Sequence, residues 1–164
     1  MVVLGIDPGS TAMGWGVVRC VGDELRHLDH GVFRPKGAEL TDKLAEIYGE
    51  IARLVAEHRP DAGAVEDVFM NKNVRSAMVL ASARTSAVLA LVHGSVQVFS
   101  YTPAQVKKAV TGGGRAEKGQ VGEMVRFLLA LEATPPSDAG DALGVALCHG
   151  MRAPMLDQLS ELGA

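Results

Sequence analysis

Four carboxylic acids stand where a folded chain does not ordinarily place an isolated charge. Asp7 follows the apolar run 2–6, and Glu66 lies within the apolar run Ala-Val-Glu-Asp-Val. Asp138 and Asp141 are three residues apart at an expected helix start, so their side chains share one face. Burying a carboxylate is costly unless a partner compensates for the lost hydration. A divalent cation is such a partner, and Mg²⁺ and Mn²⁺ prefer oxygen ligands.

This set of acids predicts metal-dependent hydrolysis of a phosphodiester. In such sites two ions, bridged here by Asp7, activate a water and stabilise the leaving 3′ oxygen. No nucleophilic side chain is then required, and the sequence contains neither Gly-x-Ser-x-Gly nor His-Glu-x-x-His. Two divalent ions would also turn the formal net charge of −3 positive, which lessens the repulsion of DNA.

Each acid also has a purely structural interpretation. Asp7 could shape the Asp-Pro-Gly turn that it begins, and Glu66 could be a protective charge on an edge strand. Asp138 and Asp141 could be acids favoured by the dipole at a helix N-terminus, which for Asp138 alone is the better interpretation. Together the four favour a metal site, because three different elements would supply acids to one end of a sheet.

Periodicity and turn residues predict the elements that must position these acids. Strands are expected at 2–7, 14–19, about 25–33, 62–68 and 95–101, and helices from 40 to just before Pro60, at 74–92, from Thr102, at 117–131 and from Ser137 to about Met151. The first three strands form an antiparallel meander, and the strand–helix–strand order that follows forces parallel pairing. We therefore expect one α/β domain over residues 1–164, a mixed five-stranded sheet with helices on both faces. The last ~10 residues are expected to form a loosely ordered tail.

Composition is that of a soluble globular protein, with 164 residues, 48% hydrophobic and 21% charged. The N-terminus lacks the basic segment of a signal peptide, and Arg84 interrupts the apolar stretch 77–92, so no membrane segment is expected. Cys20 and Cys148 have no zinc-type spacing and are expected to be buried as small hydrophobic residues. These features favour a cytoplasmic location.

Charge is unevenly distributed along the chain. The segment 72–118 has seven basic residues and one acid, hence +6, which leaves −9 for the remainder of a chain of net charge −3. The basic residues are Lys72, Arg75, Arg84, Lys107, Lys108, Arg115 and Lys118. This segregation permits a basic DNA-binding face on an acidic protein. Ordinary solvated side chains would have the same composition, so charge alone does not decide between the two.

Four motifs resemble those of the RuvC family of Holliday junction resolvases, which have the ribonuclease H-like fold. They are Gly5-Ile6-Asp7-Pro8-Gly9-Ser10 with Gly14-Trp15-Gly16, then Glu66 to Asn73, then Ala116-Glu117-Lys118 after a glycine-rich stretch, and Asp138 to Ala146. The resemblance covers nearly the whole chain. The first motif alone is not specific, because sugar kinases share it, but the four together are.

The resemblance implies a function and roles for particular residues. It implies that Asp7, Glu66, Asp138 and Asp141 are metal-binding catalytic acids, and that Lys107 and Lys118 serve phosphate binding and catalysis. It also implies a homodimer that makes paired, symmetric nicks in a four-way junction during DNA recombination and repair. A branch-migration motor is the implied partner.

Further DNA contacts are expected around the second motif. An exposed Phe69 could stack on an unpaired base, worth about 1–3 kcal/mol; the alternative is a core residue that closes the sheet end. Met70 flanks it, and Lys72 and Arg75 are candidates for phosphate contacts. Lys108 points away from Lys107 on a helix and is expected to be solvated.

The helix at 74–92 is the expected dimer interface. It carries Ala77, Ala81, Ala83, Ala87 and Ala90, and small side chains permit close helix approach. The alternative is burial of these alanines against the chain's own sheet, and one helix can do both.

Three other functions share features with this sequence. A sugar-kinase-like ATPase needs a second similar domain, for which 164 residues are too few. A ribonuclease H-like RNA-processing nuclease and a non-catalytic junction-binding module stay open as alternatives.

Overall fold

The computed structural model describes residues 1–67, 73–113 and 119–162, with side chains as far as residue 153. The elements are β1 (Val2–Asp7), β2 (Met13–Val21), β3 (Glu24–Phe33), α1 (Leu40–His58), β4 (Ala62–Glu66), α2 (Val74–His93), β5 (Gln97–Tyr101), α3 (Pro103–Thr111), α4 (Gln120–Leu128) and α5 (Ser137–Leu162). Element types and order agree with the sequence analysis throughout the described residues.

The five strands form one mixed sheet in the order β3-β2-β1-β4-β5. The meander β1–β2–β3 is antiparallel, whereas β4 pairs parallel to both β1 and β5. The α/β architecture expected from the sequence is therefore confirmed. Because β4 lies inside the sheet, the interpretation of Glu66 as an edge-strand charge is wrong.

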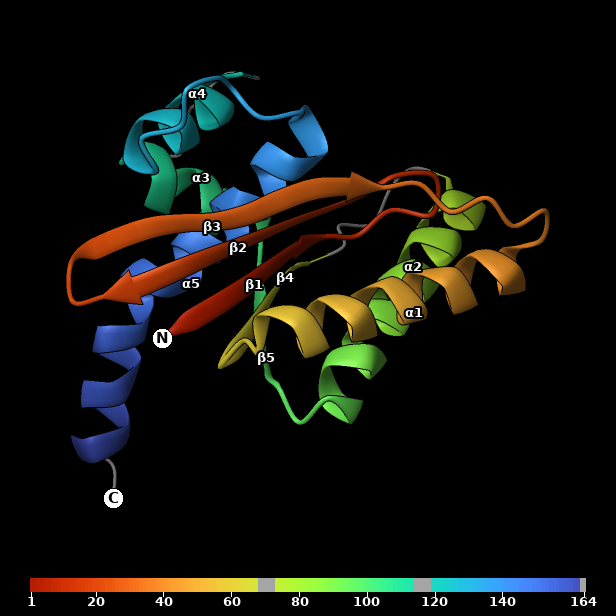
Figure 1. Cartoon of the computed structure of the whole chain (residues 1–164), viewed down its shortest axis with the longest axis horizontal. Helices are drawn as coiled ribbons and strands as arrows, with labels where there is room; N and C mark the ends of the chain where they lie inside the picture. Colours follow the sequence, from red (N-terminus) through yellow and green to blue (C-terminus); the bar gives the residue numbers. More distant parts are fainter. Residues whose placement is uncertain (68–72, 114–118, 163–164) are drawn as a thin grey trace.

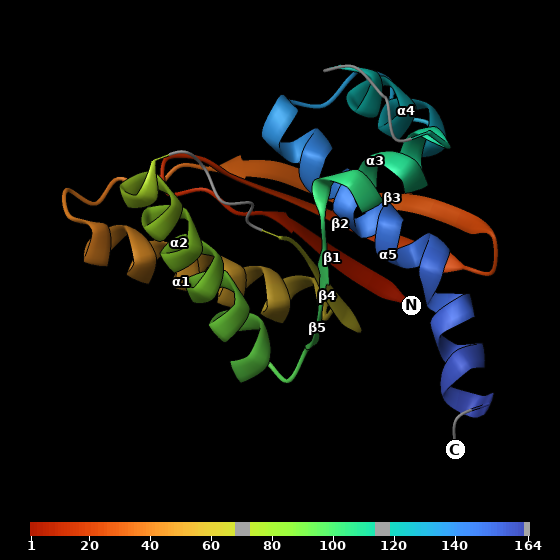
Figure 2. The same cartoon turned by 180° about the vertical axis from the view of Figure 1, so that it is seen from behind.

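Helices cover both faces of the sheet (Figure 1). One core cluster joins α1 and α2 to the sheet, and the other joins α3, α4 and α5 to its opposite face. The view from behind shows α2 lying in front of α1 (Figure 2). Because β1 and β4 are paired in parallel, their carboxyl ends lie side by side.

Glycines in β1 and β2 allow α5 to lie unusually close to the sheet. A Cβ atom at Gly14 would lie 1.8 Å from the Asp138 carbonyl oxygen, and one at Gly5 would lie 2.1 Å from that of Ala142. Only glycine fits these positions, because a methyl group there would overlap the helix backbone. The close approach brings the first turn of α5 to the end of β1.

Several element boundaries differ from expectation: β2 is longer at both ends, β5 begins at Gln97, and α4 ends at Leu128. Strand β4 ends at Glu66, and α5 continues past Met151 to Leu162, with Pro154 inside it. Most residues after Pro154, such as leucine, glutamine and glutamate, have good helix propensity, which explains why the helix continues. The expected loose order of the last residues stays a prediction.

Helix α2 has two distinct faces. Among the described helices it is long and apolar enough, by length and composition alone, to cross a membrane, although no membrane segment was expected. It nevertheless buries Ala83, Ala87 and Leu91 in the core beneath the sheet. We therefore interpret it as a core helix with an additional apolar outer face.

Cys20 and Cys148 are both buried and free, as expected.

Candidate active site

Asp7 and Glu66 meet because their strands are neighbours. In the parallel pairing of β1 with β4, Ile6 lies opposite Val65, so the residues that follow them reach the same level at the strand ends. A hydrogen bond joins the two side chains. Parallel strands place their carboxyl ends at one edge of the sheet, which is where ligands bind in α/β proteins.

The first turn of α5 supplies the other two acids. Asp138 is half-buried and Asp141 is exposed, and the negative charge of each acts on Asp7. Gly14, which pairs with Asp7 across β1 and β2, is also the residue whose missing side chain admits the Asp138 backbone. The structure thus brings together all four acids predicted from the sequence, which we call the acid cluster.

Electrostatics within the acid cluster are unfavourable without a cation. Burial, followed by the charges of Glu66 and Asp141, raises the pKa of Asp7 from 3.8 to about 8. Burial and the charge of Asp141 also raise the pKa of Glu66, whereas the hydrogen bond from Asp7 and the charge of Lys107 lower it. Asp7 therefore holds a proton near neutral pH and donates it to Glu66. A divalent cation would replace that proton.

A cavity of about 510 Å³ lies between the acid cluster and the α3–α4 side of the molecule. Glu66 and Asp141 line one part of it and Lys107 of α3 lines another. It is also lined by Pro103, Gly119, Val121, Gly122, Thr134, Pro135, Ser137 and Gly140. Acids and a lysine that line one cavity suit a phosphodiester, because a cation held by the acids would neutralise one oxygen and the lysine another.

The other predicted DNA contacts fall into two groups. Arg75 is exposed at the start of α2 and lines a small cavity with Ser10, in the loop that follows Asp7. Lys108 is exposed, as expected. The remaining candidates lie outside the described residues: Phe69, Met70, Lys72 and Lys118.

One residue near the acid cluster was not predicted as a site residue. Arg84 of α2 donates hydrogen bonds to the backbone oxygen of Glu66 and to the Ser100 hydroxyl. In the sequence Arg84 stands out as an arginine inside an otherwise apolar helix, and it is one of the seven basic residues of the segment 72–118.

A second group of possible metal ligands lies elsewhere. Among the described residues, Asp29, Glu57 and His58 have ligand atoms within 4.8 Å of one another. His58 ends α1, which leads into the start of β4, so this group lies toward the opposite end of the sheet from Glu66. It takes no part in the acid cluster.

Comparisons with known proteins agree with this geometry. The family model described as crossover junction endodeoxyribonuclease RuvC matches residues 3–149. The RuvC protein of Alkalilimnicola ehrlichii is 47% identical over 162 residues, covering 99% of this chain and 98% of its own. That of Trichlorobacter lovleyi is 50% identical over 150 residues, covering 91% and 84% respectively.

Solved structures lead to the same family. Thermus thermophilus RuvC in complex with a Holliday junction substrate superposes with a TM-score of 0.89 at 37% identity, over 94% of this chain and 96% of that one. The acid cluster thus lies in a ribonuclease H-like fold with a full-length sequence match. This chain belongs to the RuvC family of crossover junction endodeoxyribonucleases.

Proposed function

We propose that this chain acts as a homodimer that cuts four-way DNA junctions by paired, symmetric nicks, in a reaction that depends on divalent cations held by the acid cluster. The observation that carries the proposal is the convergence of four acids from β1, β4 and α5, with the pKa of Asp7 raised to about 8. Carboxylates with such strongly perturbed pKa values are expected at a functional site.

The acid cluster fits divalent cations, by its donor chemistry and by its electrostatics. All four side chains offer hard carboxylate oxygens, which suit Mg²⁺ or Mn²⁺. Asp7, Glu66, Asp138 and Asp141 are the residues that would hold the ions, and the other three acids all act on Asp7. Bound ions would supply Lewis acidity that ionises the attacking water and stabilises the leaving 3′ oxygen.

The protein's own residues orient the reaction. Asp7 and Glu66 are fixed by the sheet, which is more rigid than a loop, so the attacking water meets the phosphorus from a defined direction. Lys107, which lines the same cavity as Glu66 and Asp141, would hold a phosphate oxygen and neutralise charge that develops on it. Lys118 would share that role by its motif position.

DNA contacts outside the cavity follow from motif position and exposure. Phe69 would stack on a base at the junction centre, with Met70 beside it. Lys72 and Arg75 would contact phosphates, and the exposure of Arg75 beside the loop after Asp7 supports its part in this.

The proposed dimer interface is the outer face of α2. Five residues form the α2 stripe, a row at helical spacing: Met78, Ala81, Thr85, Leu89 and Val92. All five are exposed, with Met78 66%, Leu89 46% and Val92 53% accessible. Contiguous apolar surface of this kind is typical of a protein contact. Ala83, Ala87 and Ala90 are buried in the chain's own core. Most of the alanines predicted as the interface therefore pack within the chain itself.

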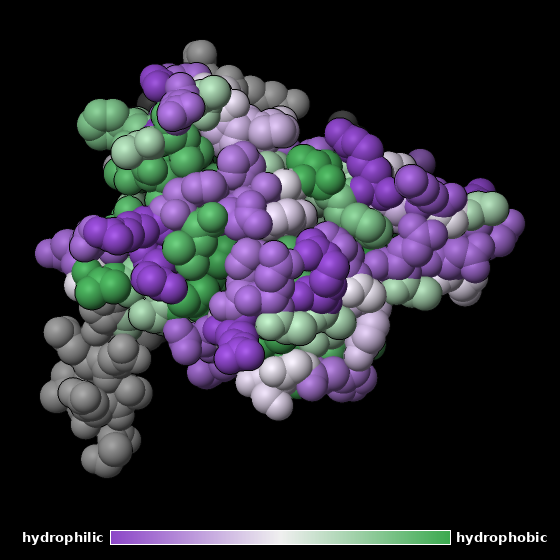
Figure 3. Space-filling view, in the orientation of Figure 1, coloured by the Kyte–Doolittle hydropathy of each residue, from purple (hydrophilic) through white to green (hydrophobic). Residues whose placement is uncertain are grey.

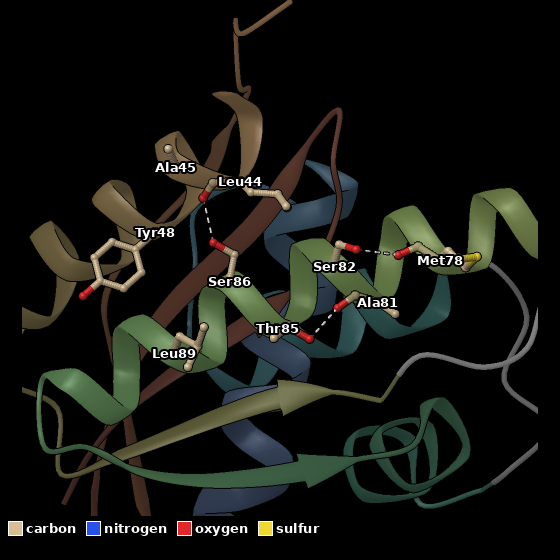
Figure 4. Close-up of a pocket in the computed structure, with 9 residues that line it drawn as sticks. All are labelled: Leu44, Ala45, Tyr48, Met78, Ala81, Ser82, Thr85, Ser86 and Leu89. Carbon is tan, nitrogen blue, oxygen red and sulfur yellow. Dashed lines mark hydrogen bonds between the residues drawn. The ribbon is translucent and has the colours of Figure 1, made fainter. Parts of the chain in front are cut away.

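A groove beside the α2 stripe completes the proposed interface. It has a volume of about 640 Å³, and Leu44, Ala45 and Tyr48 of α1 form its other wall (Figure 4). Internal hydrogen bonds satisfy the hydroxyls along it: Ser82 to the Met78 carbonyl, Thr85 to that of Ala81, and Ser86 to that of Leu44. With these groups paired, the groove offers an apolar seat for a second copy. In the orientation of Figure 1, the surface in the region of α1 is mixed, with hydrophilic side chains beside smaller apolar patches (Figure 3).

Replacing Leu89 with Asp is expected to disrupt the dimer. A buried, unpaired carboxylate in an interface costs about 2–5 kcal/mol, so the dissociation constant should rise at least about 30-fold. Light scattering across a concentration series measures it. Phe127→Asp is the matched control, since Phe127 on α4 is 75% exposed and lies outside the α2 stripe. If Leu89→Asp stays dimeric at the wild-type dissociation constant, the interface lies elsewhere.

Cleavage of a labelled synthetic four-way junction tests the function itself. Matched duplex and flap DNA and a structured RNA are incubated in parallel with Mg²⁺, Mn²⁺ or EDTA. We expect paired nicks at symmetric positions in the junction alone, and none in EDTA. Binding without cleavage would favour a non-catalytic junction-binding module, and cleavage of RNA would favour an RNA-processing nuclease.

Two further expectations follow from family membership. We infer that the chain works in the cytoplasm on recombination and repair intermediates, together with a branch-migration motor. The near full-length match to RuvC proteins supports both expectations.

A further inference from the structure

Arg84 is an unusual residue for its position. It lies in the apolar helix α2, and its side chain is only 22% exposed. A guanidinium group in such a place needs acceptors for its N–H groups, since burying them unpaired is costly. Among the described residues, its hydrogen-bond and ion-pair partners lie at the carboxyl ends of two strands, β4 and β5.

The contacts of Arg84 surround the peptide that follows Glu66. Its Nε donates to the Glu66 carbonyl oxygen at 3.2 Å, and its Nη2 donates to Ser100 Oγ at 2.6 Å. Nη2 also lies 3.4 Å from Asp67 Oδ1. One planar group thus fixes the backbone and flanking side chains at the point where the strand bearing a catalytic acid ends.

We propose that Arg84 is a positioning residue, which holds the end of β4 so that the Glu66 carboxylate stays aligned with Asp7 and the ions that they bind. This inference rests on the proposed function of the acid cluster. It assigns to α2 a second role beside its outer stripe, because the same helix anchors the active-site strand.

Geometry, rather than charge, is the means by which Arg84 acts. The pKa of Glu66 is raised by burial and by the charge of Asp141, and it is lowered by the hydrogen bond with Asp7 and by the charge of Lys107. Arg84 instead contacts the Glu66 backbone, and its charge is directed to Asp67. A displacement of the strand end would misalign Glu66, and misplacement by about 1 Å can cost ~100-fold in rate.

Lysine at this position separates geometry from charge. Arg84→Lys keeps the positive charge, but an ammonium group cannot reproduce the planar fork that meets two acceptors at once. We expect single-turnover cleavage of a saturated junction to slow by about 10- to 100-fold, with the junction dissociation constant within about 2-fold of wild type. The midpoints of the pH–rate profile should not move. Arg26→Lys, at an exposed arginine of β3 that pairs with Glu24, is the matched control and should cut at the wild-type rate.

A second variant and a second readout complete the test. Ser100→Ala removes one acceptor and should slow cleavage about 3-fold, with no further loss when it is combined with Arg84→Lys. Mn²⁺ titration without DNA should show about 10-fold weaker binding in Arg84→Lys, as for other residues that orient metal ligands. If Arg84→Lys does not fold, the Ser100→Ala rate and Mn²⁺ affinity decide, and wild-type values for both would overturn the proposal.

The outcomes distinguish this proposal from the proposed function. If the wild type cuts junctions and Arg84→Lys matches it in rate and Mn²⁺ affinity, the positioning role is overturned while the function stands. If junction affinity falls as much as the rate, Arg84 is a DNA contact and the proposal is again overturned. If the wild type cuts no junction, the proposed function fails, and the Mn²⁺ titration alone decides whether Arg84 positions Glu66.

Discussion

Asp7→Asn is expected to reduce single-turnover junction cleavage by at least about 1,000-fold, because the variant would lose one of the proposed ligands of the divalent cations. Junction affinity should stay within a few-fold of wild type, since phosphate contacts by basic residues supply most of it. Gel-shift binding in Ca²⁺ and quenched-flow cleavage in Mg²⁺ measure the two quantities separately.

The control for this variant is Asp23→Asn, at an exposed turn between β2 and β3, which should bind and cut as the wild type does. Equal losses of binding and cleavage in Asp7→Asn would mean that Asp7 serves the fold rather than the reaction. That result would restore the interpretation of Asp7 as a turn residue.

The metal-free protein is expected to lose stability as pH rises from 5 to 8. The pKa of Asp7 is raised from 3.8 to about 8 in the folded state, so the folded chain holds a proton that the unfolded chain has released. The stabilisation is fully present below about pH 4 and is lost as pH rises through the folded pKa. One pKa unit corresponds to about 1.4 kcal/mol, and since the acid cluster shares the proton we expect a total change of about 3 kcal/mol.

Urea denaturation in EDTA at several pH values measures this change, with Asp7→Asn as the comparison. The variant should be the more stable protein at pH 8 and should show a shallower slope, with a remainder from Glu66, whose pKa is raised too. His27, whose pKa is lowered by burial, acts in the opposite direction but equally in both proteins, so the difference isolates Asp7. Mg²⁺ at pH 8 should restore wild-type stability. Identical slopes in EDTA would mean that Asp7 is not the titrating group.

Local sequence patterns were sufficient for the elements and for the acids. Alternating and helical periodicities predicted the meander and the later strand–helix units, and the structure confirms them. Asp7 and Glu66 could be recognised because a charge at the end of, or within, an apolar run is costly and needs a reason. Lys107 was found through the resemblance, and the cavity that it shares with Glu66 supports that identification.

Contacts between distant segments were beyond what local patterns carry. Arg84 was visible as a charge in an apolar helix, yet its partners, Glu66 and Ser100, lie 18 and 16 residues away and become neighbours only in the folded sheet. The role of the α2 alanines was likewise left open by the sequence, since alanine is compatible with a helix–helix contact and with a buried core. Only the direction from which the sheet covers α2 decides between them.

The sequence by itself determined which residues could do chemistry, because residue type and local hydrophobic pattern are properties of short segments. Tertiary structure alone decided how those residues meet. The order β3-β2-β1-β4-β5 puts Asp7 beside Glu66, and the missing side chain of Gly14 lets α5 bring Asp138 within reach. Both depend on long-range packing, where a fraction of an ångström between backbones decides whether four acids become one site.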